Sequence, residues 1–417
     1  MVATRSKETL MFLFLVLYML ISTNFLSCSV ISRELCKYLN IFFIGYFILQ
    51  LLVDKRRIIK GQMFFKKEVI AFILFPLLSG FSCNILEGQS VFLSIKAALP
   101  MLVFVLYFYL HKKQVSEKNA MKAVFFIALA IAVIQLVQQF LPGHAIFGIE
   151  GENEADVAAN MEHRMRNGLY RFLMHFNGIF TFPLLYYSWS KIRQKQSVKY
   201  RVLFILMLVS AYLTLTRQVM VVVLASLMIS IFLLKEKTNK KLTFVLCGAF
   251  VLALFNNFDS LFGELINKSV NEVGNENYAR YYSMSYFWQE STKNLVAFLF
   301  GHGLPSSGTA YDDYIQKLAD MQCYASDVGA IGAAFKFGWC YVAVFYLMVL
   351  KVWVKYRKII PSYLTLFLVS TLLFSLFMFL ISKNYYVAPF AIMLYVIDLH
   401  ISKSSLASDI NDKNGIL

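Results

Sequence analysis

The sequence is poor in charged residues, in cysteine and in the short motifs of soluble enzymes. Charged residues make up 15% of its 417 residues and hydrophobic residues 59%, so the chain has too little polar surface to cover a water-soluble globule. Its six cysteines form no Cys-x-x-Cys pair, which leaves no zinc spacing and no sign of a disulfide framework. No P-loop motif and no Asp-x-Asp motif occurs, which excludes a nucleotide-driven pump and leaves a metal-bound nucleotide-sugar site without support. We therefore expect no metal ion and no cofactor.

Charge alternates along the chain. Long apolar runs are separated in turn by segments that are rich in Lys and Arg and by segments that are poor in them. The positive-inside rule requires this alternation of a protein that crosses a membrane many times. We therefore assign the formal net charge of +16 mostly to cytoplasmic loops. Because the basic residues do not gather on one soluble face, we expect no nucleic-acid partner. The basic segments are Lys55 to Lys67, His111 to Lys122, Lys191 to Arg201, Lys235 to Lys241 and Lys351 to Lys358.

The apolar runs predict an all-α, polytopic integral membrane protein, because a spanning helix needs about 20 apolar residues. We predict about twelve transmembrane helices in a single membrane domain over residues 1–417, with both termini in the cytoplasm. Arg5 and Lys7 before the first run resemble the start of a signal peptide, but no Ala-x-Ala site follows, which favours a first transmembrane helix. The predicted spans are 10–30, 38–53, 69–86, 90–110, 122–141, 169–189, 201–216, 218–234, 242–258, 328–350, 361–381 and 385–401.

Two of the segments predicted on the outer side are long. The first, 142–168, holds an acidic stretch, and the second, 259–326, is net acidic. Loops of this length in a compact protein are usually functional, whereas the predicted cytoplasmic loops are all short. We therefore expect the chemistry, or the recognition, to face outward.

Three residues on the predicted outer side are candidate catalytic groups. Arg217 interrupts a long apolar run, where a charge needs protein, water or an anion as its partner. The parity of the basic segments places Arg217 at an outer turn between two spans. The alternative for this apolar run is one long tilted helix. The alternative for the Arg217 side chain is that it extends to the outer lipid headgroups without binding a ligand. Arg280 lies in an aromatic-rich stretch, and an arginine binds phosphate oxygens in bidentate pairs.

His302 is the third candidate. It lies between two glycines, which permit a sharp turn. A neutral histidine there is a candidate general base or a donor to phosphate. A solvated histidine in a plain Gly-x-Gly turn is the alternative.

Four further residues are candidate substrate-binding groups. Arg164, Arg166 and Arg171 form a basic cluster at the end of the first outer segment, where salt pairing with the neighbouring acidic stretch is the alternative. Asp327 opens the helix that follows the second outer segment. It is either the N-cap or first residue of that helix or a group that binds substrate.

Two lysines lie inside predicted spans. Lys96 and Lys336 are flanked by apolar residues, and an ionisable group within a membrane is a functional candidate. Both lie near a helix end, however, where a lysine can extend its ammonium group to the interface. We favour that second interpretation.

The order of these features resembles the bacterial O-antigen polymerase (Wzy) family and its relatives, the capsule polymerases and the O-antigen ligases. The resemblance covers residues from about 200 to 350. O-antigen ligases of this group usually carry a His-Asn pair near the start of the span after the large loop, and its absence here favours a polymerase. The segments that carry the resemblance are Leu215-Thr216-Arg217, Tyr278 to Tyr286, Asn294 to Gly303, Tyr324-Ala325-Ser326-Asp327 and Phe337-Gly338.

The resemblance implies a metal-independent glycosyltransferase of lipopolysaccharide or capsule polysaccharide biosynthesis, a multi-pass protein of the cytoplasmic (inner) membrane. Such a polymerase transfers the growing glycan from undecaprenyl pyrophosphate to a new lipid-linked repeat unit on the outer face. Its partners would be the undecaprenyl-pyrophosphate-linked oligosaccharide, membrane lipid, a chain-length regulator and a flippase. Arg217 and Arg280 would bind the pyrophosphate, and His302 would act as base or phosphate donor. The alternatives are an O-antigen ligase and a flippase or transporter of the same lipid-linked unit; a transporter would be expected to show internal repeats, and none is visible in the sequence.

Overall fold

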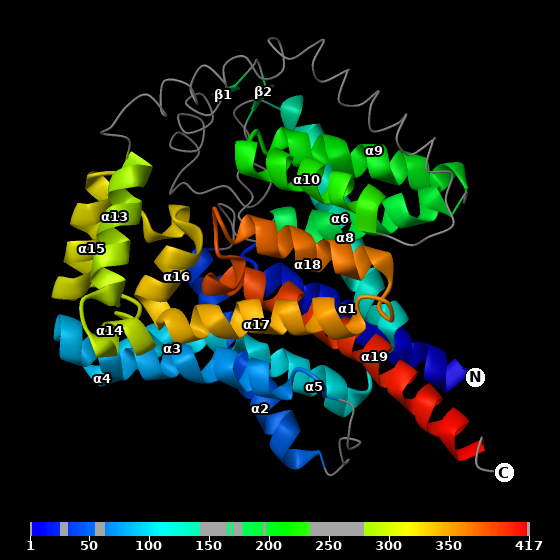
Figure 1. The fold of residues 1–417 in the computed structure, drawn as a ribbon, viewed down its shortest axis with the longest axis horizontal. Helices are drawn as coiled ribbons and strands as arrows, with labels where there is room; N and C mark the ends of the chain where they lie inside the picture. The colour runs from blue at the N-terminus through cyan, green and yellow to red at the C-terminus, as the bar shows by residue number, and fades with distance from the viewer. Residues whose placement is uncertain are drawn as a thin grey trace.

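The computed structural model describes residues 2–25, 32–54, 63–141, 165–166, 169–170, 177–194, 197–233 and 279–414. These residues form a bundle of helices, with one hairpin of two short strands as their only sheet (Figure 1). The elements up to residue 233 are α1 (Val2–Ser22), α2 (Arg33–Val53), α3 (Lys66–Glu87), α4 (Val91–Ala98), η1 (Leu99–Phe104), α5 (Val105–Lys113), α6 (Glu117–Gln139), β1 (Met165–Arg166), β2 (Leu169–Tyr170), α8 (Asn177–Arg193), α9 (Val198–Leu213) and α10 (Arg217–Leu233). The elements from residue 279 are α13 (Ala279–Thr292), α14 (Leu295–Phe300), α15 (Ala310–Asp320), η2 (Ala325–Asp327), α16 (Gly329–Phe337), α17 (Trp339–Tyr356), α18 (Ser362–Phe374), η3 (Leu380–Ser382) and α19 (Asn384–Asn414).

Apart from this hairpin the elements of the described residues are helical, and the apolar helices among them are those of a multi-pass membrane protein. Six of the described helical segments are long and apolar enough to cross a membrane, and two shorter apolar helices, Gln218–Ile231 and Ser362–Phe374, accompany them. These six segments account for half of the twelve predicted spans. The six are Glu34–Val53, Lys66–Glu87, Val91–Lys113, Glu117–Gln139, Trp339–Tyr356 and Asn384–Ser404.

Four predicted spans differ from the helices of the structure. The span predicted at 10–30 ends as a helix at Ser22. The span predicted at 169–189 is wrong at its start, because residues 169–170 form β2 and α8 begins only at Asn177. The span predicted at 328–350 is broken into α16 and α17 at Gly338, whose φ of +84° no helix interior adopts. The span predicted at 361–381 ends as a helix at Phe374. The span predicted at 242–258 lies outside the described residues.

The chain around residue 215 forms two helices, as the parity of the basic segments predicts. Helix α9 ends at Leu213 and α10 begins at Arg217. Leu215 between them has a φ of +45°, which an α-helix excludes. One long tilted helix over this run is therefore wrong.

Helix α19 lies inside the bundle, whereas α2 lies at its edge. Most side chains of the membrane-crossing part of α19 are buried, whereas only about a fifth of those on α2 are buried. Large apolar side chains cover the outer face of α2, among them Phe42 at 69% and Leu52 at 78% exposed. An apolar surface of this kind suits contact with lipid, which is as apolar as the side chains themselves.

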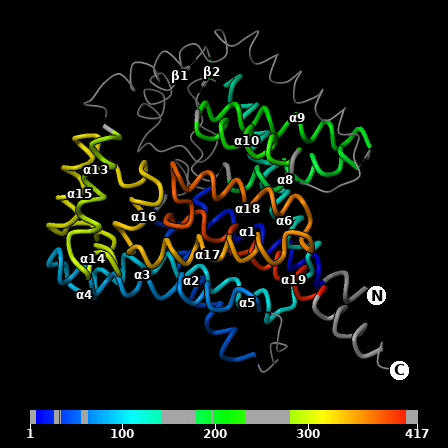
Figure 2. The backbone as a smooth tube through the Cα atoms, viewed as in Figure 1, coloured from blue at the N-terminus to red at the C-terminus, as the bar shows by residue number. Residues whose placement is uncertain are grey.

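The two ends of the bundle differ. Both chain termini lie at one end, and α13, α14 and α15 gather at the other (Figures 1 and 2). At the end with the termini, the carboxylate of Asp398 on α19 is buried and accepts hydrogen bonds from the Phe64 amide at 2.9 Å and from the Tyr107 hydroxyl, while His111 Nε2 lies 3.2 Å away. These contacts satisfy a charge that would otherwise be costly in an apolar interior, and they fix α19 to α5.

The described part of the second outer segment is not a loop. Residues 279–327 form α13, α14, α15 and η2, and they pack on α16. We call residues 279–337 the cap. The cap has its own small apolar core, which joins α13, α15 and α16 and consists of Phe287, Leu318, Cys323, Val328 and Phe335.

Candidate functional site

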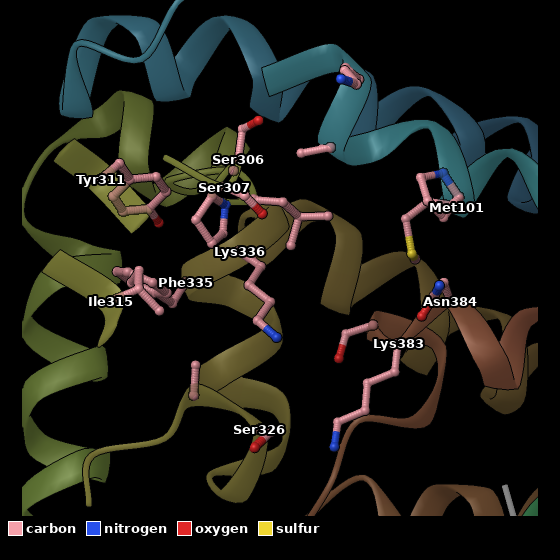
Figure 3. Close-up of a pocket in the computed structure, with 18 of the residues that line it drawn as sticks. Met101, Ser306, Ser307, Tyr311, Ile315, Ser326, Phe335, Lys336, Lys383 and Asn384 are labelled. Atoms are coloured by element: carbon pink, nitrogen blue, oxygen red, sulfur yellow. The ribbon is translucent and has the colours of Figure 1, made fainter. Parts of the chain in front are cut away.

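A cavity of about 820 Å³ lies where the cap meets the bundle. Helices α13 and α15, α16 and the loop after α14 form its cap side, while α2, α4 and residues 382–385 form its bundle side (Figure 3). The cavity therefore lies at the end of the bundle away from the chain termini. According to the predicted topology, this is the outer end.

Lysine side chains dominate the charge of this cavity. Lys336 lies on α16, and Lys383 is the residue that precedes α19. The side chains of both lysines are directed into the same space (Figure 3). Lys96 on α4 and Lys37 on α2 also line the cavity. Lys37 is paired with Glu34, but among the described residues none of the other three lysines forms an ion pair. The cavity thus holds positive charge that suits an anion.

Burial and mutual repulsion act on the two facing ammonium groups. Burial, with the like charge of Lys383, lowers the pKa of Lys336 to about 8, while Asp327 opposes that shift. Burial also lowers the pKa of Lys383, again opposed by Asp327. A bound anion would stabilise the charged form of both lysines, because an opposite charge nearby favours ionisation.

Hydroxyl and amide groups surround the lysines. Ser306, Ser307, Ser326 and Asn384 line the cavity (Figure 3). The Tyr311 side chain also lines it, and its buried hydroxyl has no hydrogen-bond partner among the described residues. A buried hydroxyl without a partner is costly, so this group is available to a ligand. Ammonium, hydroxyl and amide groups together are the donors that a phosphorylated sugar requires.

Gln89 holds one wall of the cavity in place. Its side-chain oxygen accepts hydrogen bonds from the Ser306 amide and the Thr309 hydroxyl, each at 2.9 Å. Its side-chain nitrogen donates to the Leu304 carbonyl at 3.1 Å and to the Ser94 hydroxyl at 2.8 Å. One buried amide therefore fixes the loop after α14 against α4.

The Gly-His-Gly turn is a packing junction. A Cβ on Gly301 would lie 2.5 Å from the Lys336 carbonyl carbon, and a Cβ on Gly303 would lie 2.7 Å from the Ser79 carbonyl oxygen. Both glycines have positive φ, at +72° and +77°. Only glycine permits the turn to approach α3 and the end of α16 this closely. The Gly303 amide donates to the Lys336 carbonyl at 2.9 Å, so this turn positions the residue that carries one of the two cavity ammonium groups.

His302 is buried, and both of its ring nitrogens are engaged. Nε2 lies 3.1 Å from the Glu290 carbonyl oxygen, which only accepts, so Nε2 carries a proton. Nδ1 lies 2.5 Å from a carboxylate oxygen of Glu87, and the proton between them belongs either to the imidazolium or to the carboxyl group. The solvated-turn alternative is wrong, because the residue is only 3% exposed. In this geometry His302 connects α3 to α13 and has no nitrogen free to act as a base.

Arg280 lies beside the start of α10. When the Gln218 amide is oriented with its oxygen toward Arg280, this oxygen accepts hydrogen bonds from Nη1 at 3.1 Å and from Nη2 at 2.9 Å. Arg217 immediately precedes Gln218 and is the first residue of α10, although its side chain lies outside the described residues. The structure thus brings together the segments of two predicted catalytic residues. Neither Arg280 nor Gln218 lines the lysine cavity. Helix α13 nevertheless connects the two sites, since it carries Arg280 and also contributes Phe287 to the wall of the cavity.

The other predicted substrate-binding residues fall in different places. Arg164 and Arg171 lie outside the described residues, and Arg166 is described only as part of β1. Asp327 does not cap the following helix: it ends η2, and Val328 is the N-cap of α16. Asp327 accepts a hydrogen bond from the Ser326 hydroxyl at 3.0 Å, and its charge acts on both cavity lysines.

Three cavity lysines differ from what the sequence predicts. Lys96 and Lys336 were expected to extend toward the interface, but both line the cavity. Lys383 was missed because it follows a predicted span and looks like an ordinary loop lysine. Its position beside Asn384 and Tyr385, at a predicted outer end, is the only signal in the sequence. Among the described residues no group of three or more His, Cys, Asp or Glu is placed to hold a metal ion.

Comparisons with known proteins found no similar protein. No protein-family model, no curated protein and no solved structure matches the chain.

Proposed function

We propose that this chain is a surface-polysaccharide repeat-unit polymerase, for O-antigen or capsule, in the cytoplasmic (inner) membrane. It transfers the growing glycan from undecaprenyl pyrophosphate to a new lipid-linked repeat unit at the outer face. The observation that carries this proposal is the lysine cavity, in which Lys336 and Lys383 face one space with serine, tyrosine and asparagine groups around them. The short motifs between residues 200 and 350 that resemble the O-antigen polymerase family support it independently.

The chemistry of glycan transfer matches these groups. The oxygen of an acceptor hydroxyl attacks the anomeric carbon of the donor sugar, the bond from that carbon to the diphosphate oxygen breaks, and the diphosphate leaves with the bonding electrons. The hydroxyl proton passes to a base. Negative charge therefore develops on the diphosphate, and preorganised cations that stabilise such charge usually make the largest contribution to catalysis.

We assign the leaving diphosphate to Lys336 and Lys383. Asp327 accepts a hydrogen bond from Ser326, which lines the cavity, and its charge acts on both lysines. Its carboxylate is our candidate for the base, in place of His302. Arg217 and Arg280 are assigned to the diphosphate of the second lipid-linked substrate, because Arg280 and the start of α10 lie together outside the lysine cavity. A reaction between two lipid-linked substrates needs two cationic binding sites, one for the diphosphate of each substrate.

Loss of the protein tests the proposal. A strain without it should display single repeat units attached to the surface acceptor, because ligation and membrane transfer of one unit do not need a polymerase. Loss of a flippase or a ligase should instead leave no repeat unit on the acceptor. Surface polysaccharide separated on a gel distinguishes these outcomes, and the absence of one-unit material would contradict the polymerase.

A further inference from the structure

A second cavity lies at the end of the bundle that carries the chain termini. It has a volume of about 900 Å³ and is lined mainly by α6 and by the start of α9, with contributions from α1, α8, α18 and α19. Its lining is predominantly apolar, and we call its basic residues, Lys118, Lys122, Lys199 and Lys403, its rim. We call it the α6–α9 groove.

The exposed face of α6 shows how this groove is divided. Lys118, Lys122, Phe126 and Leu129 all line it, and their spacing of three or four residues places them on one face of the helix. The two lysines lie in the first turns of α6, and the two apolar residues lie further along it. Phe126 is 51% and Leu129 36% exposed. The face therefore changes from basic to apolar along the helix axis, as a lipid changes from headgroup to acyl chain.

The positive charge of the rim exceeds the negative charge of the acidic side chains around it. Lys403 on α19 pairs with Glu117 at 3.1 Å, and His400 lies 2.8 Å from the same carboxylate. Glu117 is the only acidic side chain that lines the groove in the part of the chain that the structure describes. Among the described residues, Lys118, Lys122 and Lys199 have no ion-pair partner, so the rim can bind an anion.

We propose that the α6–α9 groove is a binding site for an anionic phospholipid of the membrane, with its phosphate against Lys118, Lys122 and Lys199 and an acyl chain along Phe126 and Leu129. Basic pockets between membrane helices on the cytoplasmic side are suited to anionic headgroups, and the basic segments of the sequence assign this end of the bundle to that side. The site is distinct from the lysine cavity and does not depend on the proposed polymerase activity.

The test uses the purified full-length protein, delipidated in detergent, and two lipid probes: cardiolipin and phosphatidylcholine. Native mass spectrometry counts the retained lipid, and thermal unfolding reports its effect. We expect the wild-type protein to retain cardiolipin preferentially and to unfold at a higher temperature in its presence. Each lysine near a membrane surface contributes roughly 1 kcal/mol, so the variant Lys118→Ala/Lys122→Ala/Lys199→Ala should bind cardiolipin about 100-fold more weakly.

Two controls make the result specific. The variant Lys317→Met, at an exposed lysine of α15 that lines neither cavity, should retain cardiolipin as the wild type does. Glycerol phosphate, which carries the headgroup charge without acyl chains, should not displace cardiolipin at the same concentration. Equal retention of cardiolipin and phosphatidylcholine by the wild type, undiminished cardiolipin binding by the triple variant, or displacement by glycerol phosphate would each overturn the proposal.

Discussion

Cells that carry Lys336→Met together with Lys383→Met are expected to make roughly 100- to 1000-fold less polymer, because that is the usual cost of removing a preorganised contact to charge in a transition state. Methionine keeps the apolar stem of lysine but removes the ammonium group. Since the two ammonium groups repel each other in the folded protein and have lost water, their removal should not lower the amount of folded protein. The measurement is the chain-length distribution of the surface polysaccharide, with protein amounts in the membrane matched by immunoblot.

Lys317→Met is the matched control for this prediction. Lys317 is an exposed lysine on α15 that does not line the cavity, so its replacement changes the net charge of the cap equally. We expect wild-type chain length from this variant. Wild-type chain length from the double variant would remove both lysines from the mechanism.

The same lysines predict a defined pH dependence for the proposed polymerase. The folded-state pKa of Lys336 is about 8, below that of an unfolded lysine at about 10.4. Between these values the unfolded chain binds more protons than the folded protein, so this residue makes stability rise with pH through that window. Binding of a diphosphate should fall over the same window, because Lys336 loses its charge. Lys336→Met should remove the contribution of Lys336 to both effects and leave that of Lys383, whose pKa is also lowered.

Gly338→Ala is expected to abolish most of the folded protein. Gly338 has a φ of +84°, and a Cβ there would lie 2.0 Å from the Leu299 carbonyl oxygen. With a ψ of 160°, this backbone conformation is essentially restricted to glycine and costs another residue about 1–3 kcal/mol, and overpacking typically adds about 1–3 kcal/mol. The contact joins the end of α14 to the break between α16 and α17, so a shift would also move Lys336. Fluorescence-detected size exclusion and thermal unfolding in detergent measure the loss.

Gly308→Ala separates the two causes. Gly308 has a similar φ of +76°, but no atom lies within 4 Å of the position that a Cβ would take. This variant therefore has the backbone strain without the clash and should unfold at a temperature clearly above that of Gly338→Ala. Equal unfolding temperatures for the two variants would show that the close approach of α14 and α16 is not what requires glycine at 338.

The sequence predicted the membrane helices better than the cap. Apolar runs indicate helices that contact lipid or pack inside a bundle, and the spans at α2, α3, α5, α6 and α19 follow from them. Helices α13 and α15 were expected as loop, because their mixed composition has no long apolar run: they bury only a narrow set of residues against each other and α16. The break at Gly338 was hidden because Phe337 and Trp339 continue the apolar run across it, and only the contact with Leu299 explains it.

The candidate site was predicted in part, for a similar reason. The Gly-His-Gly turn stood out in the sequence, but Glu87, which engages His302, is far from it along the chain. Lys336 and Lys383 come together only because a cap helix and the start of α19 face one cavity. Single cations spaced this widely show no pattern in a sequence, whereas their shared cavity is evident in the fold.

Binding of undecaprenyl pyrophosphate to the purified protein in lipid nanodiscs tests most directly whether the lysine cavity holds the diphosphate of a lipid-linked substrate. We predict that the wild-type protein binds this lipid at least about 10-fold more tightly than undecaprenol, which lacks the diphosphate, since a single charge-assisted hydrogen bond contributes about 1.5–3 kcal/mol. Lys336→Met/Lys383→Met should weaken this preference, which would then depend on Arg217 and Arg280 alone, and Lys317→Met should keep it in full. An undiminished preference for undecaprenyl pyrophosphate in the double variant would contradict the account.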